Sequence, residues 1–202
     1  MVYSEFTMPR LRKEYGLEMI GQPALFVDAQ PAVISDWLRL TLEKQTATAL
    51  KSGSEKARSE YLIAPILMEA YDQSRDYANL FSGVEFDVDK SQGLSGFCDF
   101  LFTLTPRAIE VLAPVVSVVE AKKEDIPKGI PQCLAELVAA QIFNLAEGHP
   151  IEILYGIVTT GTAWKFLRLQ GKLATIDTDE YFLIQPEKIV GIILSMLCQR
   201  LL

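Results

Sequence analysis

Val-Val-Ser-Val-Val-Glu-Ala-Lys, residues 115–122, is the segment from which the architecture of this chain can be worked out. Its β-branched residues predict a buried strand, because such side chains pack well on a pleated surface. Side chains alternate along a strand, so Glu120 and Lys122 share one face and Ala121 points to the other. A carboxylate and an amine at the end of an apolar strand are costly unless a metal or a substrate uses them. The segment therefore predicts a strand that ends at a chemical site.

The composition is that of a globular protein with one core. The sequence has 202 residues, of which 50% are hydrophobic and 22% are charged, and this fits a single domain. Cys98, Cys133 and Cys198 are an odd number without metal-ligand spacing, so we expect reduced core cysteines in an intracellular, cytoplasmic protein. No secretory signal opens the sequence, and its longest apolar run, 189–198, is about half the length that crosses a bilayer. We therefore expect no membrane association.

The net charge of −7 restricts the function classes. A protein that binds nucleic acid without catalysing a reaction normally carries a basic surface, and this composition does not predict one. A metal-dependent enzyme is less constrained, because bound divalent cations neutralise carboxylates at the point of contact. The charge argues against a simple nucleic-acid-binding module and leaves a metal-dependent nuclease open.

The periodicity of the apolar residues predicts an α/β fold with a central mixed β-sheet flanked by helices. We expect helices over 31–50, 54–72, 131–147 and 187–202, strands over 83–89, 97–104, 115–122, 152–160 and 163–169, and a short hairpin arm within 173–183. Pro65 predicts a kink near Ile63 in the second helix. The first three strands form an antiparallel meander. The strand–helix–strand order after Lys122 then implies a crossover to a parallel strand.

We divide the single domain, 1–202, into three parts. Residues 1–53 are expected to form an N-terminal arm and helix, of which residues 1 to about 30 are extended or partly helical. Residues 54–170 form the core, and 171–202 form a C-terminal hairpin and helix. Because this last helix is apolar on most sides, it must be buried, either in the core or against a second copy of the chain. The second alternative predicts a homodimer.

Ionisable and amide residues stand at the ends of the predicted apolar elements, in the order Glu60, Asp99, Glu120, Lys122 and Gln132. This order, with the segments 96–100, 118–122 and 131–136 as its strongest part, resembles the PD-(D/E)xK nuclease superfamily. The resemblance runs from about residue 59 to 169 and implies the restriction-endonuclease-like fold.

The resemblance also implies a metal site. In that family a strand acid, the Glu of the E-x-K and a neighbouring backbone carbonyl hold one or two Mg²⁺ ions, which here implicates Asp99, Glu120 and the Ala121 carbonyl. Glu60 would complete the acidic cluster as a further ligand. Mn²⁺ would be able to substitute for Mg²⁺. Carboxylate and carbonyl oxygens are hard ligands, so these residue types suit such a cation.

The remaining residues of the resemblance imply the reaction. Lys122 would orient and help to deprotonate the attacking water, and Gln132 would contact the site. The metal lowers the pKa of a bound water and neutralises the charge that develops on the phosphorane. The implied activity is hydrolysis of phosphodiester bonds in nucleic acid, with DNA favoured over RNA.

Each of these residues also has an ordinary structural interpretation. Glu120 and Lys122 could form an ion pair on a solvated strand edge, although the four valines among the five residues before them favour a central strand. Asp99 could be a turn or bulge carboxylate. Glu60 could be an exposed helix acid, and Gln132 a polar residue at a helix start.

Two further polar residues and a second class of function complete the expectations. Glu136, one turn after Gln132, could point the same way as Gln132, but a solvated helix face is the expected position, and His149 is expected in a loop. A non-catalytic member of the same fold, acting as a dimeric interaction or assembly protein, is the alternative function. The acidic charge and the apolar final helix favour that alternative.

Overall fold

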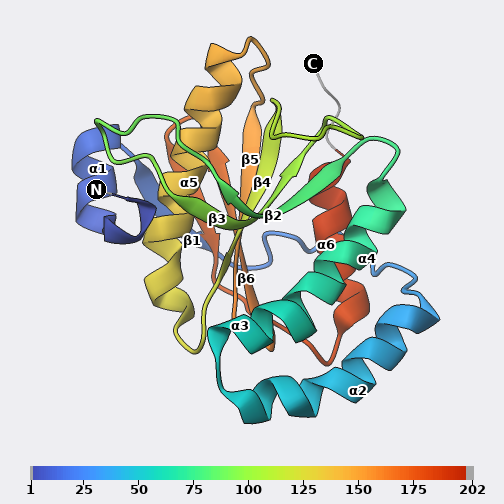
Figure 1. Cartoon of the computed structure of the whole chain (residues 1–202). Helices are drawn as coiled ribbons and strands as arrows, with labels where there is room; N and C mark the ends of the chain where they lie inside the picture. Colours follow the sequence, from blue (N-terminus) through green and yellow to red (C-terminus); the bar gives the residue numbers. More distant parts are fainter. Residues whose placement is uncertain (1, 199–202) are drawn as a thin grey trace.

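A mixed β-sheet of eight described strands runs through the molecule, with helices on both of its faces (Figure 1). The computed structural model describes residues 2–198. The strands are β1 (Glu18–Gln22), β2 (Asn79–Glu85), β3 (Phe97–Thr103), β4 (Val115–Ala121), β5 (Ile153–Thr159), β6 (Ala163–Gln170), β7 (Leu173–Asp177) and β8 (Tyr181–Phe182). Their order is β1-β7-β6-β5-β4-β3-β2, and β8 pairs with β6. The predicted α/β class with a mixed sheet is confirmed.

The connections of the central strands are those that the sequence predicts. β2, β3 and β4 pair antiparallel in succession, and β4 pairs parallel with β5. Every residue of β4 is buried, as its run of β-branched side chains indicates. The end of β4, where the acid and the amine lie, is therefore inside the sheet and not at an edge.

The helices divide between the two faces. They are η1 (Tyr3–Glu5), α1 (Met8–Tyr15), α2 (Asp36–Ser52), α3 (Glu55–Arg58), the π-helical turn η2 (Ser59–Ile63), α4 (Ala64–Ser74), α5 (Ile126–Ala146) and α6 (Pro186–Leu197). α1 and α5 pack on one face, and α4 and α6 pack on the other with α2 outside them (Figure 1). No helix among residues 2–198 is long and apolar enough to cross a bilayer.

The predicted second helix is interrupted where its proline requires it. Ser54 caps α3 by accepting a hydrogen bond from the Ala57 N–H at 3.0 Å. The turn η2 then widens the helix before α4 resumes at Ala64, with Pro65 in its first turn. Proline has no N–H and its ring clashes with the preceding turn, so a regular α-helix cannot pass through it undisturbed. The predicted cap and the irregularity near Ile63 are confirmed.

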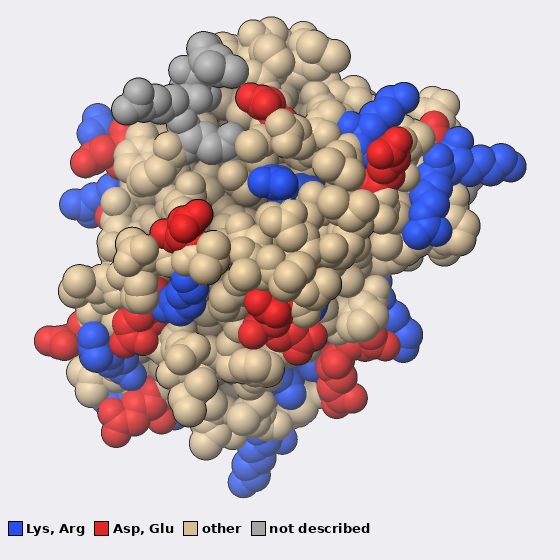
Figure 2. Space-filling model, turned by 180° about the vertical axis from the view of Figure 1, so that it is seen from behind, with Lys and Arg blue, Asp and Glu red and all other residues tan. Residues whose placement is uncertain are grey.

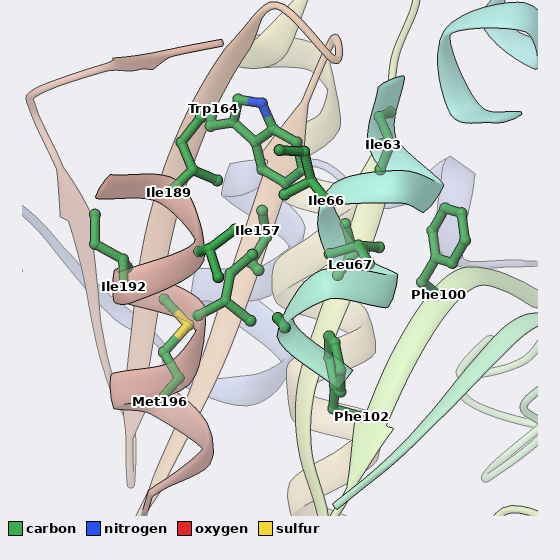
Figure 3. Close-up of a cluster of buried hydrophobic side chains, with 14 of the residues drawn as sticks. Ile63, Ile66, Leu67, Phe100, Phe102, Ile157, Trp164, Ile189, Ile192 and Met196 are labelled. Atoms are coloured by element: carbon green, nitrogen blue, oxygen red, sulfur yellow. The ribbon is translucent and has the colours of Figure 1, made fainter. Parts of the chain in front are cut away.

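The final helix is buried within the chain's own core. Figure 3 shows Ile189, Ile192 and Met196 of α6 on one side of the cluster, and Trp164 of β6 and Leu67 of α4 among its other members. Of the two expectations for this helix, the structure shows the first. Its buried side chains are not a surface for a second copy, and a homodimer remains an untested prediction. The predicted helix extends to 202, and 199–202 lie outside the described residues.

Three predicted boundaries were wrong, two of them because helix-capping residues were overlooked. α2 begins at Asp36 and not at Pro31, since the Ser35 hydroxyl accepts from the Leu38 N–H. α5 begins at Ile126, with Asp125 as its cap, so that Pro131 lies inside the helix. β2 covers 79–85 and not 83–89. Its predicted second half turns away, and the Asp89 carboxylate accepts from the N–H groups of Ser91 and Gln92.

An early and a late segment of the chain pair in the sheet. β1, from the arm that the sequence left unassigned, pairs parallel with β7 of the predicted C-terminal hairpin. Such pairing between distant segments leaves no local signal in either one. The cysteines are all free thiols, and Cys98 and Cys133 are buried as expected. Cys198, however, is exposed, because it follows the last turn of α6.

Candidate functional site

The site begins where the pairing of β3 and β4 stops. Phe100 and Val119 are the last paired residues at this end of the two strands. Beyond them the Asp99 side chain continues the contact, because its Oδ2 accepts a hydrogen bond from the Ala121 N–H at 2.8 Å. Glu120, which directly precedes Ala121, is only 2% exposed. The end of β4 thus holds two acids from neighbouring strands.

Lys122 and the helix α5 close this group of side chains. The Lys122 ammonium forms an ion pair with Glu120 and also donates to Gln132 Oε1 at 3.3 Å. The Gln132 amide nitrogen donates to Glu120 Oε2 at 2.8 Å and to Glu136 Oε1 at 3.1 Å. One glutamine therefore connects both glutamates and the lysine. We call Asp99, Glu120, Lys122, Gln132 and Glu136 the polar cluster.

Two glycines bring α5 close enough to the sheet for these contacts. A Cβ on Gly129 would lie 2.6 Å from Val158 Cγ1 and 3.1 Å from Lys122 Cγ. A Cβ on Gly156 of β5 would lie 2.7 Å from the Cys133 sulfur. Real side chains do not pack at such distances, so the helix would have to move outward. The aliphatic part of Lys122 runs directly beneath the start of α5, and this fixes where its ammonium emerges.

Burial and mutual repulsion raise the pKa of every acid in the polar cluster. The pKa of Glu120 rises to about 7, first because it is buried and then because Asp99 is close, against the attraction of Lys122. The pKa of the fully buried Glu136 is also raised well above its usual range, by burial and by the charge of Glu120. Burial also raises the pKa of Asp99, although the Ala121 N–H opposes this. The cluster has more acids than its single lysine can neutralise.

Lys122 nevertheless remains a cation. Burial favours its neutral amine, but the charge of Glu120 outweighs this and the pKa of Lys122 is raised. Glu55, at the start of α3, acts electrostatically on both Lys122 and Asp99. In Figure 1, α3 and the start of α5 lie at the same end of the sheet. Glu55 is thus a further acid near the cluster, and the sequence analysis missed it.

The structure places Glu60 away from the polar cluster. Its side chain lies on η2, is 50% exposed, and pairs with Lys56 at 3.0 Å. None of the contacts described for residues 2–198 joins it to Asp99, Glu120 or Lys122. The widened turn before Pro65 leaves Glu60 on the outer side of the helix. Glu55, one turn earlier and beside the Ser54 cap, is the acid of this segment that acts on the cluster.

The expectation for Glu136 was wrong, whereas that for His149 holds. Glu136 is completely buried and is not on a solvated face, because it lies one turn after Gln132 on the side that faces β4. The spacing of four residues was the available signal. His149 is exposed in the loop after α5.

The donor set suits a hard cation, although the side chains are engaged with one another. Among the described residues, no group of three or more His, Cys, Asp and Glu side chains is arranged to hold a metal. Glu136 Oε2 is buried without a hydrogen-bond partner, and this unused oxygen fits a cation ligand. Both Glu120 oxygens are bound, one by Lys122 and one by Gln132. For a cation to bind Glu120, the ammonium would have to move aside.

Comparison with known proteins does not assign the chain to a family. The sequence matches no known protein-family model, and a search of curated proteins gives no significant match. The resemblance to the PD-(D/E)xK nucleases therefore rests on Asp99, Glu120, Lys122 and Gln132 and on their order along the chain.

Proposed function

We propose that this chain is a metal-dependent nuclease of the PD-(D/E)xK type that uses Mg²⁺, or Mn²⁺ in its place, to hydrolyse phosphodiester bonds, with DNA favoured over RNA. The observation that supports this most is the convergence of Asp99, Glu120 and Lys122 at the ends of β3 and β4. Asp99 and Lys122 are 23 positions apart in sequence, and they stand at the ends of two different strands. The order Asp99, Glu120, Lys122 is the order of these residue types in the PD-(D/E)xK nucleases.

The residues of the chain have distinct parts in this proposal. Asp99 and Glu120, with the Ala121 carbonyl, would hold the cation. A divalent cation bound there supplies a water of lowered pKa and neutralises charge on the phosphate oxygens. Lys122, released from Glu120, would hold that water by hydrogen bonding and stabilise the hydroxide. Gln132 fixes the Glu120 carboxylate through Oε2.

The raised pKa values favour a site for a cation. A buried cluster with excess negative charge costs folding free energy, and such groups concentrate at functional sites. A divalent cation would remove the repulsion between Glu120 and Asp99 that helps to raise the pKa of Glu120. It would also reduce the negative charge that the protein presents to a phosphodiester.

A cleavage assay tests the proposal. The purified chain would be incubated with single- and double-stranded DNA and RNA, in Mg²⁺, in Mn²⁺ and in chelator. We expect metal-dependent cleavage, which Lys122→Ala and Asp99→Ala reduce by about 10²- to 10⁴-fold. Lys123→Ala is the matched control, because this neighbouring lysine is exposed. Absence of cleavage of every substrate by the wild type, or cleavage by both variants at the wild-type rate, would reject the proposal.

The alternative is a non-catalytic member of the fold that acts as an interaction or assembly protein. The acidic charge supports it, and the face in Figure 2 shows positive and negative side chains interspersed without a broad basic area. The decisive measurement is calorimetry with Mn²⁺ on wild type and Glu120→Ala. Binding that the substitution removes favours the enzyme, and no binding to either protein favours the alternative.

A further inference from the structure

A polar row crosses the face of the sheet that α6 covers, opposite to the face that holds the polar cluster. Ser117 of β4 pairs with Tyr155 of β5, Tyr155 with Arg168 of β6, and Arg168 with Thr175 of β7. Directly paired residues share one face of a sheet. Three atoms of this row are buried without a hydrogen-bond partner, namely Ser117 Oγ, Arg168 Nε and Thr175 Oγ1. Buried polar atoms without partners are uncommon and call for an explanation.

Arg168 is the most costly member of the row. Its Nε is buried without a hydrogen-bond partner, and no ion pair between Arg168 and another residue from 2 to 198 is found, although the sequence has 26 acids. A partly buried cation without a partner loses hydration without compensation. Its neighbour across the strand pair, Tyr155, has a raised pKa because of burial, which the charge of Arg168 partly offsets. The two side chains thus offer several donors that the protein itself does not use.

These donors line a small cavity. It has a volume of about 230 Å³ and lies between Arg168 and Tyr155 on the sheet, the turn 25–29 and Ser195 on α6. The Lys188 ammonium donates to the carbonyls of Phe26 and Ala29, at 3.2 and 2.6 Å, and so secures the turn that forms the outer wall. The wall is therefore tied to α6 and does not depend on a ligand.

The size and charge of the cavity select the ligand. Sites for drug-sized molecules are commonly about 300–1,000 Å³, so this cavity is too small for a nucleotide and suits an inorganic ion or a small acid. A guanidinium matches the geometry of carboxylate and phosphate oxygens. Asp28, an exposed residue that also lines the cavity, adds one negative charge and disfavours polyanions.

We propose that this cavity is a binding site for a small oxyanion, a phosphate or a small carboxylate, held by the Arg168 guanidinium with the Tyr155 hydroxyl as a second donor. The site lies on the opposite face of the sheet from the polar cluster. Tyr155 is near the start of β5, whereas the polar cluster lies beside its end, where the Lys122 N–H donates to the Thr159 carbonyl at 2.8 Å. The proposal does not depend on nuclease activity.

Binding of two probe anions tests the proposal. Inorganic phosphate and acetate would be titrated into the whole chain at constant ionic strength, with chloride as the reference, and followed by calorimetry and by amide chemical shifts. We expect saturable binding of at least one anion, with shifts at residues of the turn 25–29. Arg168→Gln should weaken it at least about tenfold, since a charge-assisted hydrogen bond is lost. Lys44→Gln, which removes an exposed cation from α2, should leave it unchanged.

The outcomes separate the sources of the ligand. Binding of phosphate alone or of acetate alone identifies the class of anion. Tyr155→Phe removes one hydroxyl and keeps the ring, so it should weaken anion binding and preserve the fold. If Arg168→Gln does not fold, anion binding by Tyr155→Phe tests the proposal. No binding of either anion to the wild type, or equal binding by wild type and both variants, would overturn the proposal.

Discussion

Two buried regions of the sheet, the apolar cluster around Trp164 on one face and the polar cluster at the end of β4 on the other, have different chemistry. Around Trp164, on the α6 face, apolar side chains from the sheet and two helices interlock (Figure 3). On the α5 face, the same sheet presents Glu120, and the helix contributes Gln132 and Glu136. Apolar side chains there would avoid the cost of desolvating charges. The buried charged groups at the end of β4 therefore reduce the stability of the fold. A functional site requires such departures from an apolar core.

The largest expected effect is in the apolar cluster around Trp164. Trp164 is fully buried, and its Nε1–H donates to the Gly161 carbonyl at 3.1 Å. Trp164→Ala should lower the free energy of unfolding by about 3–5 kcal/mol, because it leaves a large cavity. Chemical denaturation measures this. A loss below about 1 kcal/mol would show that this cluster is not the main source of stability.

The polar cluster should instead make the stability of the protein depend on pH. In the folded chain without metal, the pKa of Glu120 rises from 4.5 to about 7. The folded state then holds a proton that the unfolded state releases, so the free energy of unfolding falls as pH rises from 4.5 to 7. At about 1.4 kcal/mol for each tenfold change in proton affinity, the loss is about 3 kcal/mol.

Glu120→Gln isolates this effect. The variant lacks the titrating group, so in chelator its stability should fall less across the same pH range, and above pH 7 it should exceed that of the wild type. Thermal unfolding at several pH values gives the comparison. Parallel pH profiles for the two proteins would mean that Glu120 is not destabilised by burial.

A smaller effect on stability is expected where α5 contacts the sheet beside the polar cluster. Gly129→Ala would gain about 1 kcal/mol from helix propensity. Against this, the added Cβ would meet Val158 and Lys122 at 2.6 and 3.1 Å, and overpacking typically costs about 1–3 kcal/mol. We expect a net loss of stability and a displaced Lys122, which would weaken the proposed cleavage. Lys128→Ala, an exposed change one residue earlier, is the control. A stabilised Gly129→Ala variant would contradict the close packing.

The sequence was informative where one segment carries its own pattern. The β-branched run 115–119 predicted a buried central strand, and alternation placed Glu120 and Lys122 on one side, where the structure has them in contact. Local periodicity and local chemistry were sufficient for these two residues. Periodicity placed Asp99 inside an apolar strand, but only the resemblance implied that it lies beside Glu120, and the structure brings it to Ala121.

The sequence was uninformative where distant segments decide the outcome. The pairing of β1 with β7 depends on residues more than a hundred positions apart, and neither strand is strongly apolar. Glu136 was assigned to solvent because its burial depends on how closely α5 approaches β4, and two glycines set that distance. The row from Ser117 to Thr175 arises from strand register, which no single segment encodes.

The smallest expected effect distinguishes the two acids of the segment before β2. Glu60 and Lys56 form an exposed pair one turn apart, which contributes about 0.3–0.5 kcal/mol, so Glu60→Gln should hardly change stability. It should also leave Mn²⁺ binding nearly unchanged by calorimetry. Glu55→Gln should weaken that binding more, because the charge of Glu55 acts on Asp99 and Lys122. If instead Glu60→Gln removes metal binding and Glu55→Gln does not, the turn η2 must rearrange when a cation binds. The helix acid of the resemblance would then be Glu60.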